Sequence, residues 1–201
     1  MKSLNKLWVF GDSFSKGLGL IDDGHQYDQY KGKEKLIWPT LLAKHLKLEE
    51  KNKALNGLSN DMIFDIIKET FDEVKTGDKV IIGLTKIPRL GVYSPKSKLK
   101  LRFDKTPLRD SNIDKIPGVG FGQDWLNYIR DNMDQAYRHT IDTFLFVAKA
   151  YGLKGVRAII WDNSLWDKFP SIKHEIGVND NHWGVEGHKL FFNEIKKSFK
   201  E

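Results

Sequence analysis

Three short apolar runs, separated by segments of helical periodicity, constrain the fold of this chain more than any other feature. The runs lie at residues 7 to 10, 80 to 84 and 155 to 161. Their length and composition are typical of buried strands. Between them, apolar residues recur at helical spacing over 37 to 46, 63 to 71 and about 124 to 151. Parallel strands need crossover connections, so this alternation predicts a three-layer α/β fold whose parallel sheet is covered on both faces.

The remaining segments complete one predicted domain that spans residues 1–201. The second helical segment is expected to begin near Ser59 or Asn60, which are both good N-cap residues. A short strand at 53 to 55 would fit between the first two helices. Residues 91 to 123 lack clear periodicity and are rich in proline and glycine, which predicts an irregular insertion over the functional edge of the sheet. A C-terminal helix is indicated by Leu190, Phe191, Phe192 and Ile195.

The composition excludes several kinds of site. There is no cysteine, which rules out disulfides, thiolate metal sites and a cysteine nucleophile. No P-loop, dinucleotide fingerprint or metal-ligand cluster appears at the required spacing, so we expect no cofactor and no metal. The formal net charge of +6 comes partly from lysines and arginines between residues 96 and 115. Few aromatic residues are interleaved with them, so we interpret this stretch as a solvated loop and expect no nucleic-acid partner.

The hydropathy pattern predicts a protein that does not enter a membrane. No stretch approaches the roughly 20 apolar residues that a membrane helix needs. Residues 1 to 6 lead directly into the first apolar run, without the apolar region of a signal peptide. We therefore expect a soluble protein, cytoplasmic or phage-encoded, and the sequence sets no oligomeric state.

Gly11, Asp12 and Ser13 follow the first apolar run directly. Ligands of open α/β sheets bind outside the carboxyl ends of the strands, so this serine is placed to face a substrate. A serine hydroxyl is a poor nucleophile near neutral pH and needs a base within hydrogen-bond reach. The alternative is that the three residues only form a turn and cap a helix.

A carboxylate and an imidazole near the far end of the sequence favour the catalytic alternative. Asp180 precedes His182 by two residues, just before the C-terminal helix pattern. An imidazole held there can direct one nitrogen to Ser13 while a carboxylate orients the other, which is the division of roles in a serine triad. His188 is the rival base, although its position is more typical of the helix itself.

These motifs, taken in order, resemble those of the SGNH (GDSL-type) hydrolases, a family of esterases built on a flavodoxin-like sheet. The first block matches at Gly11, Asp12 and Ser13, and the second block matches at Gly57. The last block matches at Asp180 and His182, with Gly187 soon after them. The resemblance implies that Ser13 is the nucleophile and that the backbone N–H groups of Ser13 and Gly57 are oxyanion donors.

Two positions depart from the usual family pattern. The third block has Thr85 where Gly-x-Asn is usual, and the resemblance implies its hydroxyl as the third oxyanion donor, with Asn60 or Arg89 as substitutes. Many members have an Asp-x-x-His pattern, in which the acid precedes the base by three positions, and here that offset would select Asn179. We favour Asp180, because a carboxylate also stabilises the imidazolium. The pattern with Thr85 and a downstream Arg89 resembles one branch of the family.

The predicted function is that of a serine esterase that acts on a small ester through an acyl-enzyme, and the favoured ester is an O-acetyl group on a carbohydrate. Two alternatives remain open: a catalytically weak or inactive glycan-binding module, and an O-acyltransferase. Further candidate substrate-binding residues are Asp12, Asn60, Arg89 and Trp183. A sugar-stacking platform could combine Trp183 with other aromatic residues, namely Trp161, Trp166, Tyr93, Phe121 and Trp125. We expect at least half of these side chains to lie in the core instead.

Overall fold

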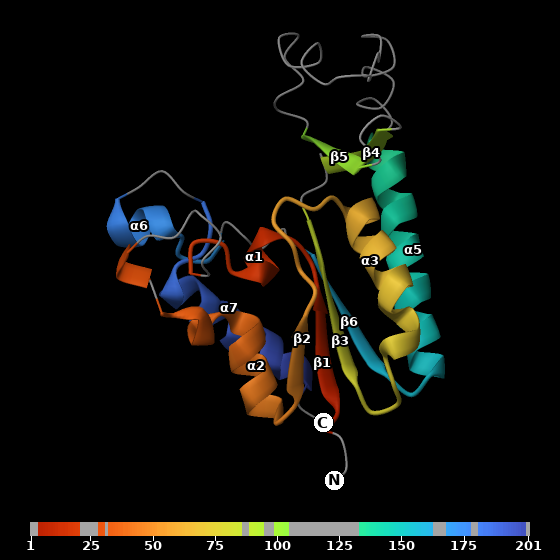
Figure 1. Ribbon diagram of the computed structural model, residues 1–201, viewed down its shortest axis with the longest axis horizontal. Helices are drawn as coiled ribbons and strands as arrows, with labels where there is room; N and C mark the ends of the chain where they lie inside the picture. The colour runs from red at the N-terminus through yellow and green to blue at the C-terminus, as the bar shows by residue number, and fades with distance from the viewer. Residues whose placement is uncertain are drawn as a thin grey trace.

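A four-stranded parallel sheet forms the centre of the molecule (Figure 1). The computed structural model describes residues 4–20, 28–30, 32–85, 89–94, 99–104, 133–162, 168–177 and 181–199. The strands are β1 (Lys6–Phe10), β2 (Glu49–Asn52), β3 (Lys79–Leu84) and β6 (Arg157–Asp162). Their order is β2-β1-β3-β6, and every neighbouring pair is parallel.

Helices cover both faces of this sheet. One face carries α3 (Asn60–Thr70) and α5 (Met133–Leu153), and the other carries α2 (Trp38–Leu46) and α7 (Val185–Ile195), as Figure 1 shows. The predicted three-layer α/β/α class with a flavodoxin-like strand order is therefore confirmed. Among the described helices, none combines the length and the apolar character that a bilayer-spanning segment requires.

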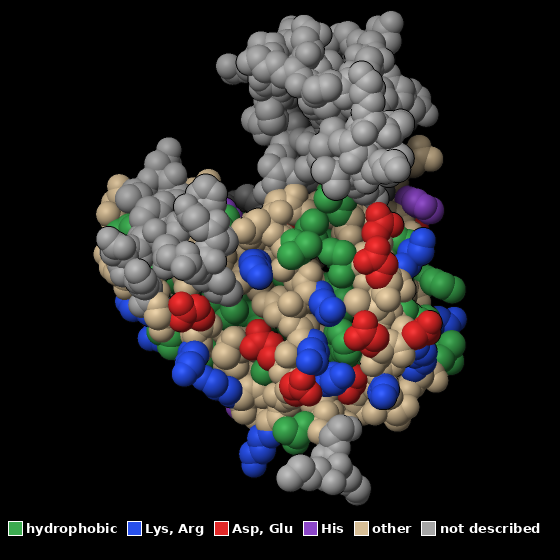
Figure 2. All heavy atoms as spheres, viewed as in Figure 1, with side chains coloured by type: hydrophobic (Ala, Val, Ile, Leu, Met, Phe, Trp, Pro, Cys, Tyr) green, Lys and Arg blue, Asp and Glu red, His purple; other side chains and the backbone are tan. Residues whose placement is uncertain are grey.

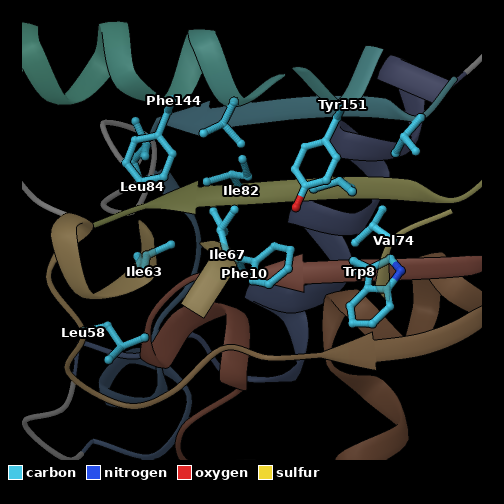
Figure 3. Close-up of a cluster of buried hydrophobic side chains, with 13 residues drawn as sticks. Trp8, Phe10, Leu58, Ile63, Ile67, Val74, Ile82, Leu84, Phe144 and Tyr151 are labelled. Atoms are coloured by element: carbon cyan, nitrogen blue, oxygen red, sulfur yellow. The ribbon is translucent and has the colours of Figure 1, made fainter. Parts of the chain in front are cut away.

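Each central strand contributes side chains to two hydrophobic cores, one on each face. Trp8, Phe10 and Ile82 lie in the core under α3 and α5, together with Phe144 and Tyr151 (Figure 3). The intervening residues Leu7, Val9 and Ile81 lie in the core under α2 and α7, with Trp38, Leu42 and Phe191. Strands buried on both faces are apolar at every position, which is why the sequence showed continuous runs there.

The predicted strand at 53 to 55 is displaced. The strand between the first two helices is β2, at Glu49–Asn52. Pairing with β1 continues beyond it, because Lys53 N–H donates to Val9 O at 2.8 Å and Leu55 N–H to Gly11 O at 3.2 Å. β2 lies at the edge of the sheet and is partly exposed, so its charged sequence gives no hydrophobic signal.

Part of the predicted irregular insertion is regular. Residues 89 to 104 contain β4 (Arg89–Ser94) and β5 (Leu99–Asp104), which pair antiparallel as a separate two-stranded sheet. The prediction of irregular structure from 91 was therefore wrong for this hairpin, whereas residues 105 to 123 lie outside the described residues. The basic residues between 96 and 115 lie outside the described residues, except for Lys100 and Arg102 in β5, whose side chains are not described. In the view of Figure 2, acidic and basic side chains are interspersed over the described surface and form no single basic patch.

Candidate active site

The candidate site lies where the chain leaves β1 and β3. These two strands are neighbours at the centre of the sheet, but the segment after β1 leads to α2 on one face and the segment after β3 leads toward α5 on the other. A crevice forms at such a reversal of direction, outside the carboxyl ends of the strands. Ser13 follows β1 and Thr85 follows β3, so both lie at this crevice.

Ser13 and His182 meet there although 169 positions separate them in the sequence. His182 Nε2 and Ser13 Oγ are 2.8 Å apart. Ser13 begins the short helix α1 (Ser13–Lys16), whose N-cap residue Asp12 accepts a hydrogen bond from Phe14 N–H at 3.2 Å. The Phe14 ring packs against the His182 ring, with 4.9 Å between centroids. A serine hydroxyl in hydrogen-bond contact with an imidazole is the arrangement that base-assisted nucleophilic attack requires.

The segment that carries His182 is held by the segment before α6 (Ile172–Ile176). Ile172 N–H donates to His182 O at 2.6 Å, and Ser171 forms an isolated antiparallel bridge with Trp183. Gly187 fits this close approach, because a Cβ there would lie 2.3 Å from Pro170 O. The glycine after the histidine therefore has a packing reason in this chain.

Three buried polar residues link the predicted blocks to one another. The Thr85 hydroxyl donates to Asp12 Oδ2 at 2.8 Å. Asn60 Oδ1 accepts from Thr85 N–H at 2.8 Å, and Asn60 Nδ2 donates to Thr85 O at 3.3 Å. This network joins the end of β1, the end of β3 and the start of α3. Sequence reasoning missed it, because no local pattern indicates which distant polar groups will pair.

The network changes the interpretation of its members. Asp12 and Asn60 were predicted as substrate-binding candidates, but both side chains hold other parts of the protein, and they are only 1% and 7% exposed. The Thr85 hydroxyl has a single hydrogen, which the contact with Asp12 uses. In this arrangement the hydroxyl supports the loop that carries Ser13 and does not direct its hydrogen to an oxyanion.

Two glycines of the motifs make room for Ser15. A Cβ at Gly11 would lie 2.4 Å from Ser15 Oγ, and a Cβ at Gly83 would lie 2.9 Å from the same atom. Ser15 is buried between the ends of β1 and β3. Any larger residue at Gly11 or Gly83 would therefore displace α1, the helix that begins with Ser13.

Gly57 lies in the loop between β2 and α3. Its φ of 74° is in the left-handed region, which favours glycine. Leu55, two residues earlier, bonds to Gly11 O, so this loop lies against the end of β1. The role of the Gly57 N–H group as an oxyanion donor stays a prediction.

His188 lies in α7 and is 1% exposed. Its Nδ1 accepts from Trp38 N–H at 3.4 Å. Burial, and to a smaller extent the charge of His182, lowers the pKa of His188 from 6.5 to about 3. The ring is therefore neutral in the folded protein and is buried, and the predicted helical position of His188 agrees with its place in α7.

Trp183 does not form a sugar-stacking surface. It is 2% exposed and packs against aromatic rings of the core, with centroid distances of 5.1 Å to Phe14 and 4.8 Å to Phe191. Trp161 is partly buried in the same core. Neighbouring residues of an extended segment point in opposite directions, so His182 at the crevice places Trp183 inside.

Several predicted residues lie outside the part of the chain that the structure describes, or have side chains that it does not describe. Asp180, Asn179, Trp166, Phe121 and Trp125 lie outside the described residues, and Arg89 and Tyr93 belong to β4 but their side chains are not described. Within the described ranges, no three histidine, aspartate or glutamate side chains gather in a way that could hold a metal ion.

No protein-family model and no curated protein matches this sequence. Among solved structures, a carbohydrate esterase described as having divergent catalytic and non-catalytic binding functions is similar over 99% of this chain and 69% of its own, with 14% identity and a TM-score of 0.47. A G-D-S-L family protein described as lipolytic, from Desulfitobacterium hafniense DCB-2, is similar over 96% and 98%, with 16% identity and a TM-score of 0.38. A protein from Slackia heliotrinireducens assigned to the SGNH hydrolases is similar over 98% and 73%, with 12% identity and a TM-score of 0.37. These proteins come from the group that the motifs resemble, and at such scores the fold assignment rests on this chain's own strand order.

Proposed function

We propose that this chain is a serine esterase of the SGNH type, with Ser13 as nucleophile and His182 as general base. The observation that carries the proposal is the 2.8 Å contact between Ser13 Oγ and His182 Nε2 at the carboxyl end of β1. Ser13 is 3% exposed and lies in a short helix whose start is fixed by Asp12. A hydroxyl held in this way loses little orientational freedom when it reacts.

The reaction proceeds through an acyl-enzyme in two steps. His182 Nε2 takes the hydroxyl proton as Ser13 Oγ bonds to the ester carbonyl carbon, and the protonated ring then gives this proton to the departing alcohol. A water molecule next loses a proton to His182 as it attacks the acyl carbon, and the acid leaves as Ser13 Oγ is reprotonated. The N–H groups of Ser13 and Gly57 stabilise the negative charge on the carbonyl oxygen in both steps.

Asp180 is proposed to accept a hydrogen bond from Nδ1 of His182 and so to fix its tautomer. Replacement Asp180→Ala should lower kcat by roughly 10⁴-fold, the loss typical of a triad carboxylate. Asn179→Ala is the matched control and should keep most of the activity. The opposite ranking of the two variants, measured by ester hydrolysis, would assign the orienting role to Asn179.

Within the esterases, we propose an O-acetyl group on a carbohydrate as the substrate. The support is the Asp180-x-His182-Trp183 pattern, which resembles acetyl-transferring members of the family. We expect faster turnover of p-nitrophenyl acetate than of the butyrate or octanoate ester, and release of acetate from acetylated oligosaccharides. A preference for the octanoate ester would contradict this choice of substrate.

The deciding experiment compares wild-type protein with Ser13→Ala in p-nitrophenyl acetate hydrolysis and in labelling by a fluorophosphonate probe. Ser15→Ala is the matched control, because it removes a hydroxyl from the same short helix without touching the Ser13–His182 contact. Wild type and Ser15→Ala should hydrolyse the ester and carry the label, and Ser13→Ala should do neither. Equal rates for wild type and Ser13→Ala, after subtraction of the background, would refute the proposal.

A glycan-binding module with little or no hydrolysis is the second candidate. It is favoured by the Thr85 hydroxyl, whose hydrogen is directed to Asp12 rather than to a substrate oxygen. This candidate predicts binding of acetylated oligosaccharides in calorimetry without fluorophosphonate labelling of Ser13. An O-acyltransferase would instead be labelled, and would transfer acetyl to an added sugar faster than to water.

A further inference from the structure

Glu175, on the short helix α6, makes contacts that tie it to the segment carrying His182. We propose that Glu175 is a positioning residue for His182: its carboxylate, held by Tyr30, fixes the start of α7 and with it the histidine three residues before. This inference rests on the proposed function, since it assigns a role toward the proposed base. It adds a residue that lies outside every motif of the family resemblance.

The carboxylate of Glu175 has partners on two other elements. The Tyr30 hydroxyl donates to Oε2, and Glu186 N–H in the first turn of α7 donates to Oε1 at 3.3 Å. Tyr30 is 3% exposed, so its aromatic ring fixes the hydroxyl in place. Burial, with a contribution from Glu175, raises the pKa of Tyr30 to about 12. Its hydroxyl therefore keeps its proton and remains a donor throughout the neutral range.

Gly184 shows that the carboxylate is seated closely against the backbone. A Cβ at Gly184 would lie 1.9 Å from Glu175 Oε1 and 2.1 Å from its carboxyl carbon. The backbone of Gly184 has φ −77° and ψ −173°, which any residue can adopt. Glycine is therefore required here for the space that the carboxylate fills and not for its conformational freedom.

Helix α6 holds the His182 segment at two points. At its first residue, Ile172 N–H donates to His182 O at 2.6 Å, and near its end Glu175 contacts Gly184 and Glu186. The stretch from 182 to 186 is thus fixed on both sides of Trp183. An imidazole on a stretch held at one point only would sample more orientations, and small displacements of a catalytic group are costly.

A purely structural role is the competing explanation, because the first N–H groups of a helix need acceptors and the N-cap residue Gly184 has no side chain to supply one. Four variants separate the two roles: Glu175→Ala, Glu175→Gln, Gly184→Ala and the double variant Glu175→Ala/Gly184→Ala. Glutamine can still accept from Glu186 N–H and can donate to the Tyr30 oxygen, so it tests rescue by a similar shape.

We expect Glu175→Ala to lower kcat about tenfold, as a small displacement of a reacting group does, with KM for p-nitrophenyl acetate unchanged. Glu175→Gln should recover most of the rate. Gly184→Ala should reproduce the loss in the wild-type background, where the methyl group displaces the carboxylate, and should add nothing when Glu175 is already alanine. The NMR signals of the His182 ring should shift in the two single variants that lose or displace the carboxylate, and less in Glu175→Gln.

Wild-type kcat and ring signals in Glu175→Ala would overturn the inference, as would an equal loss from Gly184→Ala in both backgrounds. A lower melting temperature with unchanged kcat would assign Glu175 a structural role only, and would also overturn it. If Ser13→Ala hydrolyses the ester as wild type does, the proposed function fails instead. The ring signals of His182 still decide in that case whether Glu175 positions the imidazole.

Discussion

Thr85 is the residue at which this site departs most clearly from the pattern of the family it resembles. Its hydroxyl donates a hydrogen bond to Asp12, and its backbone N–H and C=O groups are both hydrogen-bonded to the Asn60 side chain. A threonine that donates to the N-cap residue of α1 acts on Ser13 through that helix. A threonine that donates to the oxyanion would act on the transition state directly.

Replacement Thr85→Val distinguishes these two roles. If the hydroxyl supports Asp12, valine leaves a buried acceptor without its donor, and the free energy of unfolding should fall by about 1–3 kcal/mol. A kcat loss of only about tenfold should accompany it, whereas removal of an oxyanion donor costs roughly 10²–10³-fold. Thr85→Ser is the control and should resemble wild type in both measurements. A large kcat loss with unchanged stability in urea would favour the oxyanion role.

At the residue scale, the sequence indicated Ser13, His182 and the helical position of His188 because each belongs to a local pattern. The sequence left Trp183 open between a binding surface and the core, because an aromatic residue beside a base is compatible with either, and the residue lies in the core. The roles of Glu175 and Tyr30 had no local signal, since their contacts span 145 positions of the sequence.

At the scale of elements, continuous apolar runs predicted β1, β3 and β6, whose residues are buried on both faces of the sheet. Apolar residues at helical spacing predicted the four long helices, because each of these buries one regular face. Helix α6 has only five residues, too few for a periodic pattern. The β4–β5 hairpin does carry a strand signal: Leu99, Leu101 and Phe103 alternate with charged residues, which is typical of a strand with one apolar face.

The contact between β3 and α1 gives a prediction at this scale. Gly83→Ala would place a methyl group 2.9 Å from Ser15 Oγ. Overpacking of this kind should lower the free energy of unfolding by about 1–3 kcal/mol. Adding Ser15→Ala removes the obstructing oxygen and should restore most of the loss, which urea unfolding of the single and double variants would measure. A double variant no more stable than Gly83→Ala alone would show that the strain lies elsewhere.

At the scale of the whole molecule, stability should depend on pH through His188. Its pKa is about 3 in the folded protein, against about 6.5 for an exposed histidine. Below pH 6.5 the unfolded chain therefore binds a proton that the folded protein does not. The free energy of unfolding should fall as the pH drops, at up to about 1.4 kcal/mol per pH unit for this one group.

His188→Asn tests this dependence, because the asparagine oxygen can still accept from Trp38 N–H while the titrating ring is removed. The variant should be less stable at pH 7 and should lose less stability than wild type between pH 6.5 and pH 5. Urea unfolding at a series of pH values measures both slopes. Equal slopes in the two proteins would mean that other groups account for the pH dependence.

The 169 positions between Ser13 and His182 also bear on how the protein reaches its native state. Pairings between distant parts of a chain form slowly, because loop closure is paid for before the contact stabilises anything. The sheet and the other helices can thus be in place before α7 docks beside α2. During refolding from urea, ester hydrolysis should accordingly return later than the far-ultraviolet circular dichroism signal. The rate at which activity returns would then report the docking of α7.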